Sequence, residues 1–143
     1  MEAAVERAID ANLNRLGEGL RVIEDIFRYI FDDRELASRT KELRHSLRSA
    51  YNLQRVSFRD IEGDVLKEST RSEMARESLQ SVLVANFSRC EESSRVLEEL
   101  FKLSDAGMSA LFKDIRYSLY ALEKRSYESF FDEALQNSTS NSR

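Results

Sequence analysis

The sequence contains no proline and only four glycines among its 143 residues. Proline and glycine are the residues least favourable inside helices, so their scarcity allows long, uninterrupted helices. Hydrophobic residues make up 41% of the chain and charged residues 34%. This length and balance are typical of one helical domain that buries a core and solvates its outer face.

Cysteine and long apolar runs are also scarce. The single cysteine, Cys90, excludes an internal disulfide and is typical of a reducing compartment. No apolar run approaches membrane-spanning length, the first residues lack the layout of a signal peptide, and the net charge is −4. We therefore expect a cytoplasmic chain that binds neither a membrane nor, by bulk charge, nucleic acid.

Four segments carry apolar residues at steps of three and four, the spacing of an amphipathic helix. The first carries Val5, Ile9, Leu13, Leu16, Leu20, Ile23, Phe27 and Ile30. The second carries Leu36, Leu43, Leu47, Ala50 and Leu53 or Gln54. The third, from about Ser72 to Leu103, carries Leu79, Leu83, Phe87, Val96 or Leu97, and Leu100. The fourth carries Leu111, Ile115, Leu119 and Leu122 and extends towards Phe131, whereas residues 57–70 read as a long loop.

The two halves of the sequence repeat each other. Residues 11–27 (ANLNRLGEGLRVIEDIF) match residues 85–101 (ANFSRCEESSRVLEELF), 74 positions further on, and KELRHSL at 41–47 matches KDIRYSL, 72 positions further on. One helical hairpin cannot bury its apolar face alone, so the two copies should pack together. The sequence predicts an all-α four-helix bundle of two repeated hairpins with pseudo-twofold symmetry. It forms one domain over residues 1–135, with repeat halves at about 5–57 and 72–131 and a disordered tail at 136–143.

Polar residues recur in both copies beside the apolar face. Asn12 and Arg15 return as Asn86 and Arg89. A buried asparagine is costly unless its amide is hydrogen-bonded, so one explanation is a polar layer that fixes helix register. The other is an Asn/Arg pair that binds a polar ligand in a groove between the hairpins.

Gly17 and Gly19 lie within the first predicted helix, where the second copy has Glu91 and Ser93. Each glycine costs about 1 kcal/mol relative to alanine in a helix. Their presence therefore indicates close approach by another helix or by a ligand.

The second predicted helix and the loop after it are locally basic. Their cations are Arg39, Lys41, Arg44, His45, Arg48, Arg55 and Arg59, against only Glu42 and Asp60. Arginine forks match phosphate oxygens, although a solvated helix face would look similar. The loop RDIEGD at 59–64 packs three acids beside Gly63, which suits either one magnesium ion or a capped turn.

Established nucleotide and catalytic signatures are missing. The sequence has no GxxxxGKS or GxxxxGKT loop, no GxGxxG, no HExxH and no nucleophile elbow. Any site must therefore be built from helix-borne arginines, asparagines and a few acids.

Five segments that follow one another along the chain resemble a known family. They are IDANLNRLGEGLRVIED, KELRHSL, RDIEGDV, ANFSRCEESSRVLEE and IRYSLYALEK. Together they resemble the small helical hydroxymethylpyrimidine-phosphate kinase of thiamine biosynthesis, which occurs alone or fused ahead of thiamine-phosphate synthase. The likeness extends from about Ala8 to Tyr127. One departure is Leu66 and Lys67, where the family pattern leads us to expect glycine and threonine.

The resemblance implies a kinase that transfers the γ-phosphoryl group of ATP, with Mg²⁺, to 4-amino-5-hydroxymethyl-2-methylpyrimidine phosphate. Such chemistry depends on positioning and charge neutralisation. We expect Arg44, Arg59 and Asp64 to be catalytic. The expected substrate-binding residues are Asn12, Arg15, Asn86, Arg89, His45 and Arg116, and the expected metal ligands are Asp64, Glu18 and Glu92. The alternative is a non-enzymatic docking module associated with thiamine-phosphate synthase, and the sequence leaves open whether the domain forms a homodimer.

Overall fold

Every regular element in the described residues, 2–69 and 76–131 of the computed structural model, is helical. The predicted all-α class is therefore confirmed. Helix α1 (Glu2–Asp25) continues into a short π-helix (Ile26–Ile30), and α2 (Arg34–Ser46) continues into a 3₁₀ turn (Leu47–Ala50). A further 3₁₀ helix (Leu53–Phe58) precedes the loop, and α4 (Leu79–Phe101) and α5 (Ala106–Phe130) complete the fold.

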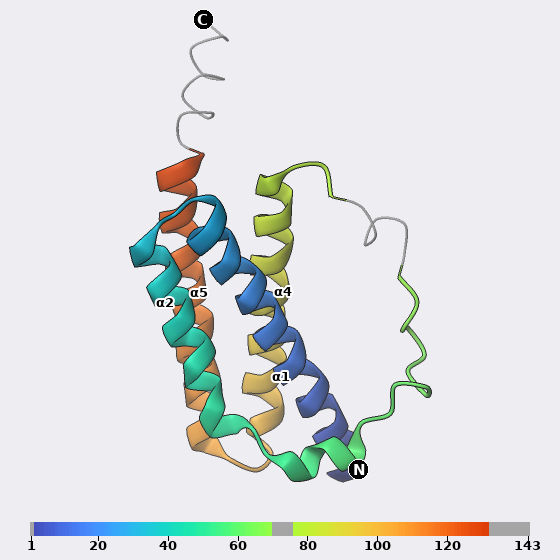
Figure 1. Ribbon diagram of the computed structural model, residues 1–143. Helices are drawn as coiled ribbons and strands as arrows, with labels where there is room; N and C mark the ends of the chain where they lie inside the picture. Colours follow the sequence, from blue (N-terminus) through green and yellow to red (C-terminus); the bar gives the residue numbers. More distant parts are fainter. Residues whose placement is uncertain (1, 70–75, 132–143) are drawn as a thin grey trace, which may run out of the picture.

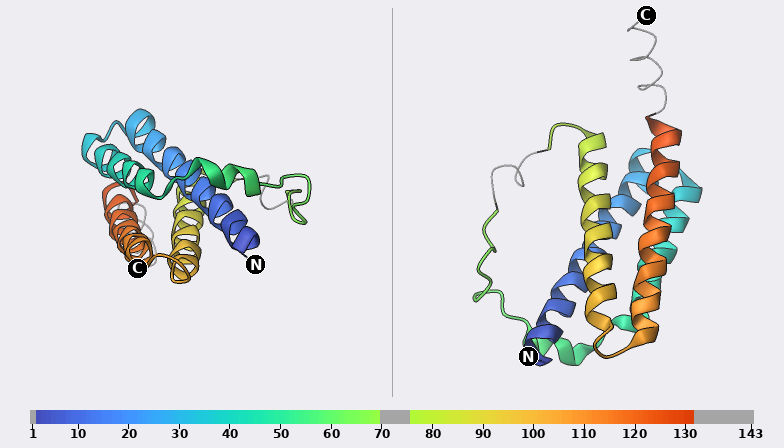
Figure 2. Two further views of the ribbon diagram at one scale, coloured as in Figure 1. Left: turned by 90° about the horizontal axis from the view of Figure 1, so that it is seen from below. Right: turned by 180° about the vertical axis from the view of Figure 1, so that it is seen from behind.

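The helices lie in two pairs. Helix α1 packs against α2, α4 packs against α5, and α1 and α4 share the most extensive contact. Seen end-on, α1 and α2 lie on one side and α4 and α5 on the other (left view of Figure 2). The loop after the last 3₁₀ helix runs along the outside of the molecule, away from α2 and α5 (Figure 1).

The core is built from the apolar faces that the sequence spacing predicts. Its fully buried members include Leu16, Leu20, Leu47, Leu83, Leu97 and Leu119. Burying a side chain of this size stabilises the fold by about 1.5–3 kcal/mol. An aromatic group at one end, in which Phe27 lies against Phe87 and Phe130, closes the core beside the α1–α2 turn.

Ile30 departs from the prediction. We expected it to continue the buried face of the first helix, but it is 58% exposed, while Ile26 is buried. The π-helix adds a residue to one turn, which rotates the following side chains away from the core. The exposure of Ile30 therefore depends on the local type of helix, which the spacing of apolar residues does not reveal.

Helix starts follow side-chain caps. Asp33 accepts a hydrogen bond from the Leu36 amide at the start of α2, and Asp105 accepts one from the Met108 amide at the start of α5. Helix α4 begins at Leu79 because Ser78 and Ser81 form a reciprocal capping box. The predicted start near Ser72 is therefore wrong over residues 76–78, and residues 72–75 lie outside the described part.

The second helix ends earlier than its apolar spacing predicts. The chain leaves α2 through the 3₁₀ turn and becomes extended at Tyr51, so Leu53 is almost fully exposed instead of packing inward. The predicted tail, 136–143, lies outside the described residues. No helix among those described is long and apolar enough to cross a membrane.

Candidate functional site

Asn12 and Asn86 satisfy their amides within their own helices. Asn12 donates from Nδ2 to the Ala8 carbonyl at 2.9 Å, and Asn86 donates to the Val82 carbonyl at 2.8 Å. Asn12 is buried and Asn86 half-buried. This geometry supplies what a polar layer beside a core requires.

Gly19 lies directly against α4. A Cβ atom built on Gly19 would stand 2.5 Å from the buried Cys90 Sγ. Helix packing therefore explains this glycine. Gly17 differs, because the nearest atom to a Cβ there is the Tyr51 hydroxyl, at 2.9 Å, and the next, Leu47 Cδ1 at 3.9 Å, is at ordinary contact distance.

Two buried glutamates hold the arginines of the second and fourth predicted helices. Glu24 accepts from Arg44 Nε at 3.0 Å and from Arg21 Nη1 at 3.3 Å. Glu98 accepts from Arg116 Nε at 3.1 Å. Arg44 and Arg116 are thus each oriented by a carboxylate, which leaves part of each guanidinium for other contacts.

The loop after the last 3₁₀ helix is fastened to α1. Arg59 forms a two-pronged ion pair with Asp10, at 2.8 and 2.9 Å, and this pairing raises the pKa of Arg59. Arg7 donates to the Asp60 carbonyl at 2.8 Å, and the Gly63 amide donates to the Asp60 carboxylate at 2.7 Å. The loop therefore forms a wall beside the first half of α1.

That wall and α1 line an open pocket of about 600 Å³, the largest of the four described here, which we call the loop pocket. Its polar lining includes Arg7, Asn14, Arg15, Glu18, Arg59 and Asp64, and its apolar lining comprises Ala4, Ala8, Ala11, Ile61 and Val65. Pockets of about 300–1,000 Å³ suit small organic ligands.

A second pocket, of about 340 Å³, adjoins the first between α1 and α2. This basic pocket is lined by Asn14, Gly17, Glu18, Arg21, Arg44, His45, Arg48 and Tyr51. Asn14 and Glu18 line both pockets, so the two adjoin along α1, and we refer to them together as the hollow. Partial burial and the nearby cations Arg48, Arg44 and Lys41 lower the pKa of His45, which indicates a positive potential here.

A third pocket, which we call the acidic pocket, lies between α4 and α5 and is lined by Ser88, Glu91, Glu92, Arg95 and Tyr120. Burial raises the pKa of Glu91 to about 8, with further contributions from its hydrogen bond to Glu123 and from the charges of Glu123 and Glu92. The Glu91 Oε2 atom is buried without a hydrogen-bond partner in the described residues.

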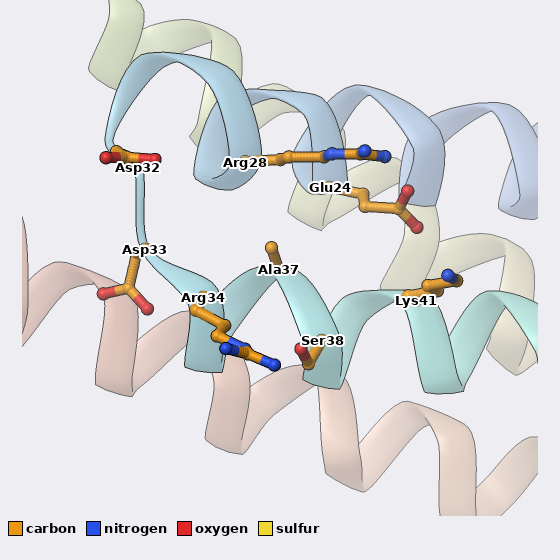
Figure 3. A pocket seen from close by; sticks show the side chains of 8 residues that line it. All are labelled: Glu24, Arg28, Asp32, Asp33, Arg34, Ala37, Ser38 and Lys41. Atoms are coloured by element: carbon orange, nitrogen blue, oxygen red, sulfur yellow. The ribbon is translucent and has the colours of Figure 1, made fainter.

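A fourth pocket lies at the α1–α2 turn, where Glu24, Arg28, Asp33 and Lys41 contribute to its walls. Figure 3 shows the Glu24 carboxylate and the Lys41 amine turned towards the same opening, while Arg34 and Ser38 project from α2 below. Its charges are balanced, and none of the predicted site residues lines it.

The structure gathers part of the predicted site in one place. Arg15, Glu18, Arg59 and Asp64 line the loop pocket, and Arg44 and His45 line the adjoining basic pocket. Glu92 lies in the acidic pocket, whereas Asn12, Asn86, Arg89 and Arg116 line none of the four. The assigned roles stay predictions.

Sequence reasoning missed Asn14 and Tyr51, and it left Arg48 between a phosphate contact and a solvated helix face. A signal for Asn14 was present, because Asn14, Gly17, Glu18 and Arg21 follow helical spacing and mark one polar stripe along α1. Tyr51 follows the end of the 3₁₀ turn, so no helical pattern places it in the pocket.

The predicted magnesium ligands do not share one site. Glu18 and Asp64 line the loop pocket, but Glu92 lies in the acidic pocket. Within 2–69 and 76–131, no three His, Cys, Asp or Glu side chains are grouped to hold a metal ion. The Asp64 carboxylate accepts from the Leu66 amide at 3.0 Å, which is a turn contact. Mg²⁺ and ATP stay predictions.

Cys90 has no features of a reactive thiol. It is fully buried, and burial raises its pKa to about 12, so the thiol stays protonated at neutral pH.

The relatives that match this chain, three of which follow, are named thiamine-phosphate synthase. The chain is 43% identical to a thiamine-phosphate synthase of Synechocystis sp. over 121 residues, which covers 84% of this chain and 35% of that protein. It is 41% identical to thiamine-phosphate synthases of Nostoc punctiforme and Rhodopirellula baltica, over 86% and 82% of this chain and 35% and 32% of those proteins. The chain therefore spans about a third of the length of these relatives, and no solved structure matches it.

These names correct the predicted function. The resemblance implied an ATP-dependent kinase of the pyrimidine phosphate, but the matched relatives are named for a synthase of thiamine phosphate. The predicted kinase is therefore wrong on this comparison. Family resemblance carried that inference, since no residue pattern in the chain specifies phosphoryl transfer.

Most of the domain, including α1, α2 and the loop that line the joined pockets, falls within one family match. The ThiD2 family matches residues 7–125, which is well over half of the sequence. The chain therefore belongs to the ThiD2 family.

Proposed function

We propose that this chain is a helical domain of thiamine biosynthesis that binds a small phosphorylated molecule in the hollow formed by the loop and basic pockets. The observation that carries the proposal is the pair Arg15 and Arg48. Each lines one of the joined pockets, and neither guanidinium makes a hydrogen bond or ion pair with the rest of the described chain.

The charge of the hollow favours an anion at the basic pocket. Three arginines and one glutamate line that pocket, giving an excess of two positive charges with His45 neutral. Glu24 already orients the Arg44 guanidinium. Arg44 therefore loses less side-chain entropy on binding an anion in the pocket than a free arginine would. Phosphate oxygens are the acceptors that such arginine forks match best.

The other end of the hollow favours a ring. Ala8 and Ala11 on α1, with Ile61 and Val65 on the loop, give the loop pocket apolar walls, while Asn14 stands at the junction. A phosphorylated pyrimidine, or thiamine phosphate, has a flat ring at one end and a phosphate at the other. The shared lining residues allow one molecule to occupy both pockets.

Calorimetric titration of the purified chain tests this function. The ligands are 4-amino-5-hydroxymethyl-2-methylpyrimidine phosphate and thiamine phosphate. The separated halves are the unphosphorylated pyrimidine, thiamine and inorganic phosphate. We expect binding by a phosphorylated ring compound that is stronger than binding by either half. Equal affinity for the compound and for inorganic phosphate would overturn the ring assignment.

Arg15 and Arg89 supply a matched pair of variants, since each occupies the same position in its sequence repeat and both are exposed. Arg15 lines the loop pocket, where its charged guanidinium can donate to a polar atom of the ring. Such a charge-assisted hydrogen bond contributes about 1.5–3 kcal/mol, so Arg15→Ala should weaken binding by about 10- to 150-fold. Arg89→Ala should leave it unchanged, because Arg89 lines none of the four pockets described above. Equal losses in both variants would contradict the proposed site.

A docking role beside thiamine-phosphate synthase is the second candidate. It is favoured by the segment after α2, where Leu53, Val65 and Leu66 are 85–93% exposed. Exposed apolar groups in one segment suit contact with another protein. Co-sedimentation with a thiamine-phosphate synthase measures this contact. We expect the unchanged chain to form a complex and the variants Leu53→Asp and Leu66→Asp to lose it. A complex that both variants retain would exclude this surface.

We further propose that the two hairpins are pseudo-twofold counterparts in a four-helix bundle. Support comes from the ion pair of Glu24 with Arg44 and that of Glu98 with Arg116, which join residues matched by the sequence repeat. Superposition of residues 8–50 on 82–122 in a crystal structure tests this arrangement, and helices that fail to superpose would refute it.

A further inference from the structure

The basic and acidic pockets occupy matching positions in the sequence repeat. The acidic pocket is lined by Ser88, Glu91, Glu92, Arg95 and Tyr120. Moved back by 74 positions on the first helix and 72 on the second, these become Asn14, Gly17, Glu18, Arg21 and Arg48. All five of those residues line the basic pocket.

Two of the residues that differ between the two pockets change the charge of the lining. Gly17 in the first half corresponds to Glu91, and Arg48 corresponds to Tyr120. The basic pocket holds three arginines against one glutamate, whereas the acidic pocket holds one arginine against two glutamates. The pockets are similar in size, about 340 and 390 Å³, so their volumes do not distinguish them.

Glu91 also occupies the space that Gly17 leaves open. Above Gly17 stands the Tyr51 hydroxyl, and Tyr51 corresponds to Glu123 in the second half. There Glu91 shares a hydrogen bond with Glu123, whose carboxylate also accepts from the Tyr127 hydroxyl at 2.9 Å. The acidic pocket thus presents carboxyl groups at the place where the basic pocket presents a bare helix backbone and a phenol.

We propose that the repeated pockets have diverged, so that only the basic pocket accepts a phosphorylated ligand and Glu91 excludes it from the acidic pocket. The inference rests on the proposed function, since it names which half of the molecule provides the site. Glu91 fills this space with a carboxyl group that keeps its proton at neutral pH, and the negative charges of Glu92 and Glu123 beside it repel an incoming phosphate. No second arginine in the acidic pocket offsets that repulsion. Glycine is unfavourable in the middle of a helix, and in the first half Gly17 is explained by the access that it leaves for the ligand.

Binding stoichiometry distinguishes the outcomes. Titration with the pyrimidine phosphate and with thiamine phosphate should give one molecule per chain for the ligand that binds. Two equivalent molecules per chain would overturn the divergence and leave the proposed function standing. No binding of either compound would overturn both.

Variants at Gly17 then test the role of charge. Gly17→Glu copies the second half into the first and should weaken binding at least about tenfold, because a like charge is placed at the anion site. Gly17→Gln has the same shape without the charge and should retain more of the affinity. Equal losses in the two variants would overturn charge exclusion as the reason.

Two arginine variants identify the occupied half. Arg48→Ala should weaken binding, whereas Arg95→Ala should not, because Arg95 lines the acidic pocket. The reverse result would place the ligand in the second half and overturn the inference. Melting curves for each variant keep loss of folding separate from loss of binding.

Discussion

Replacing Gly19 by alanine should destabilise the fold, while the same change at Gly17 should not. The Cβ of alanine at position 19 would stand 2.5 Å from Cys90 Sγ, inside the contact distance of carbon and sulfur. Cys90 is fully buried, so its side chain has no free space into which to rotate, and α1 and α4 must move apart. Such overpacking costs about 1–3 kcal/mol, against about 1 kcal/mol gained in helix propensity.

The net expectation for Gly19→Ala is therefore a loss of about 1–2 kcal/mol in the free energy of unfolding. At position 17 the nearest atom is the Tyr51 hydroxyl, the end of an exposed side chain that can swing away. Gly17→Ala should thus keep most of the helix-propensity gain and leave stability unchanged or raised by up to about 1 kcal/mol. The two substitutions lie only two positions apart in the sequence, yet their expected effects on stability differ in sign.

Urea unfolding followed by circular dichroism measures both values. Cys90→Ala combined with Gly19→Ala supplies the decisive control, because removing the sulfur makes room for the new methyl group. The double variant should be more stable than the sum of the single effects by about 0.5–2 kcal/mol. Additive effects, or a stabilised Gly19→Ala protein, would refute the close approach of α1 and α4 at this residue.

Two further predictions concern buried carboxyl groups. Glu24→Gln and Glu98→Gln should each lower the free energy of unfolding by about 2–3 kcal/mol, since each leaves an oriented arginine without its carboxylate. Calorimetric melting measures both values, and a lower melting temperature in only one variant would contradict the matched ion pairs. Burial raises the pKa of Glu91 from 4.5 to about 8, so the folded state holds this proton more tightly than the unfolded state. Its contribution to stability is complete below pH 4.5 and is lost as pH rises through 8. Because Glu91 is only partly buried, solvent screening reduces this contribution to on the order of 1 kcal/mol. Glu91→Gln should accordingly flatten the dependence of the unfolding free energy on pH over that window, and an unchanged slope would contradict the raised pKa of Glu91.

Much of the architecture could be predicted from the sequence because apolar spacing is a direct record of burial. Leu16, Leu20, Phe27, Leu83 and Leu119 all lie in the core as their spacing predicts. The prediction fails where a local change of helix type intervenes. The π-helix turns Ile30 outward, and the early end of α2 leaves Leu53 exposed.

The candidate site was less accessible to sequence reasoning. The repeat drew attention to Asn12 and Asn86, yet their amides form hydrogen bonds within their own helices. A polar residue that recurs in both halves can serve packing as well as binding. Arg59 and Asp64 reach the pocket through a loop whose path depends on the Arg59–Asp10 ion pair. Contacts between residues 49 positions apart cannot be read from helical periodicity.

Amide chemical shifts of isotopically labelled protein, recorded while the pyrimidine phosphate or thiamine phosphate is added, test most directly whether the hollow along α1 is a binding site. We predict shifts that saturate with ligand at Gly17, Arg48 and Gly63, which report on the basic pocket and the loop wall. Glu92 and Tyr120, on the acidic pocket, should stay in place. Shifts confined to the acidic pocket, or no saturable shifts with either compound, would contradict the account.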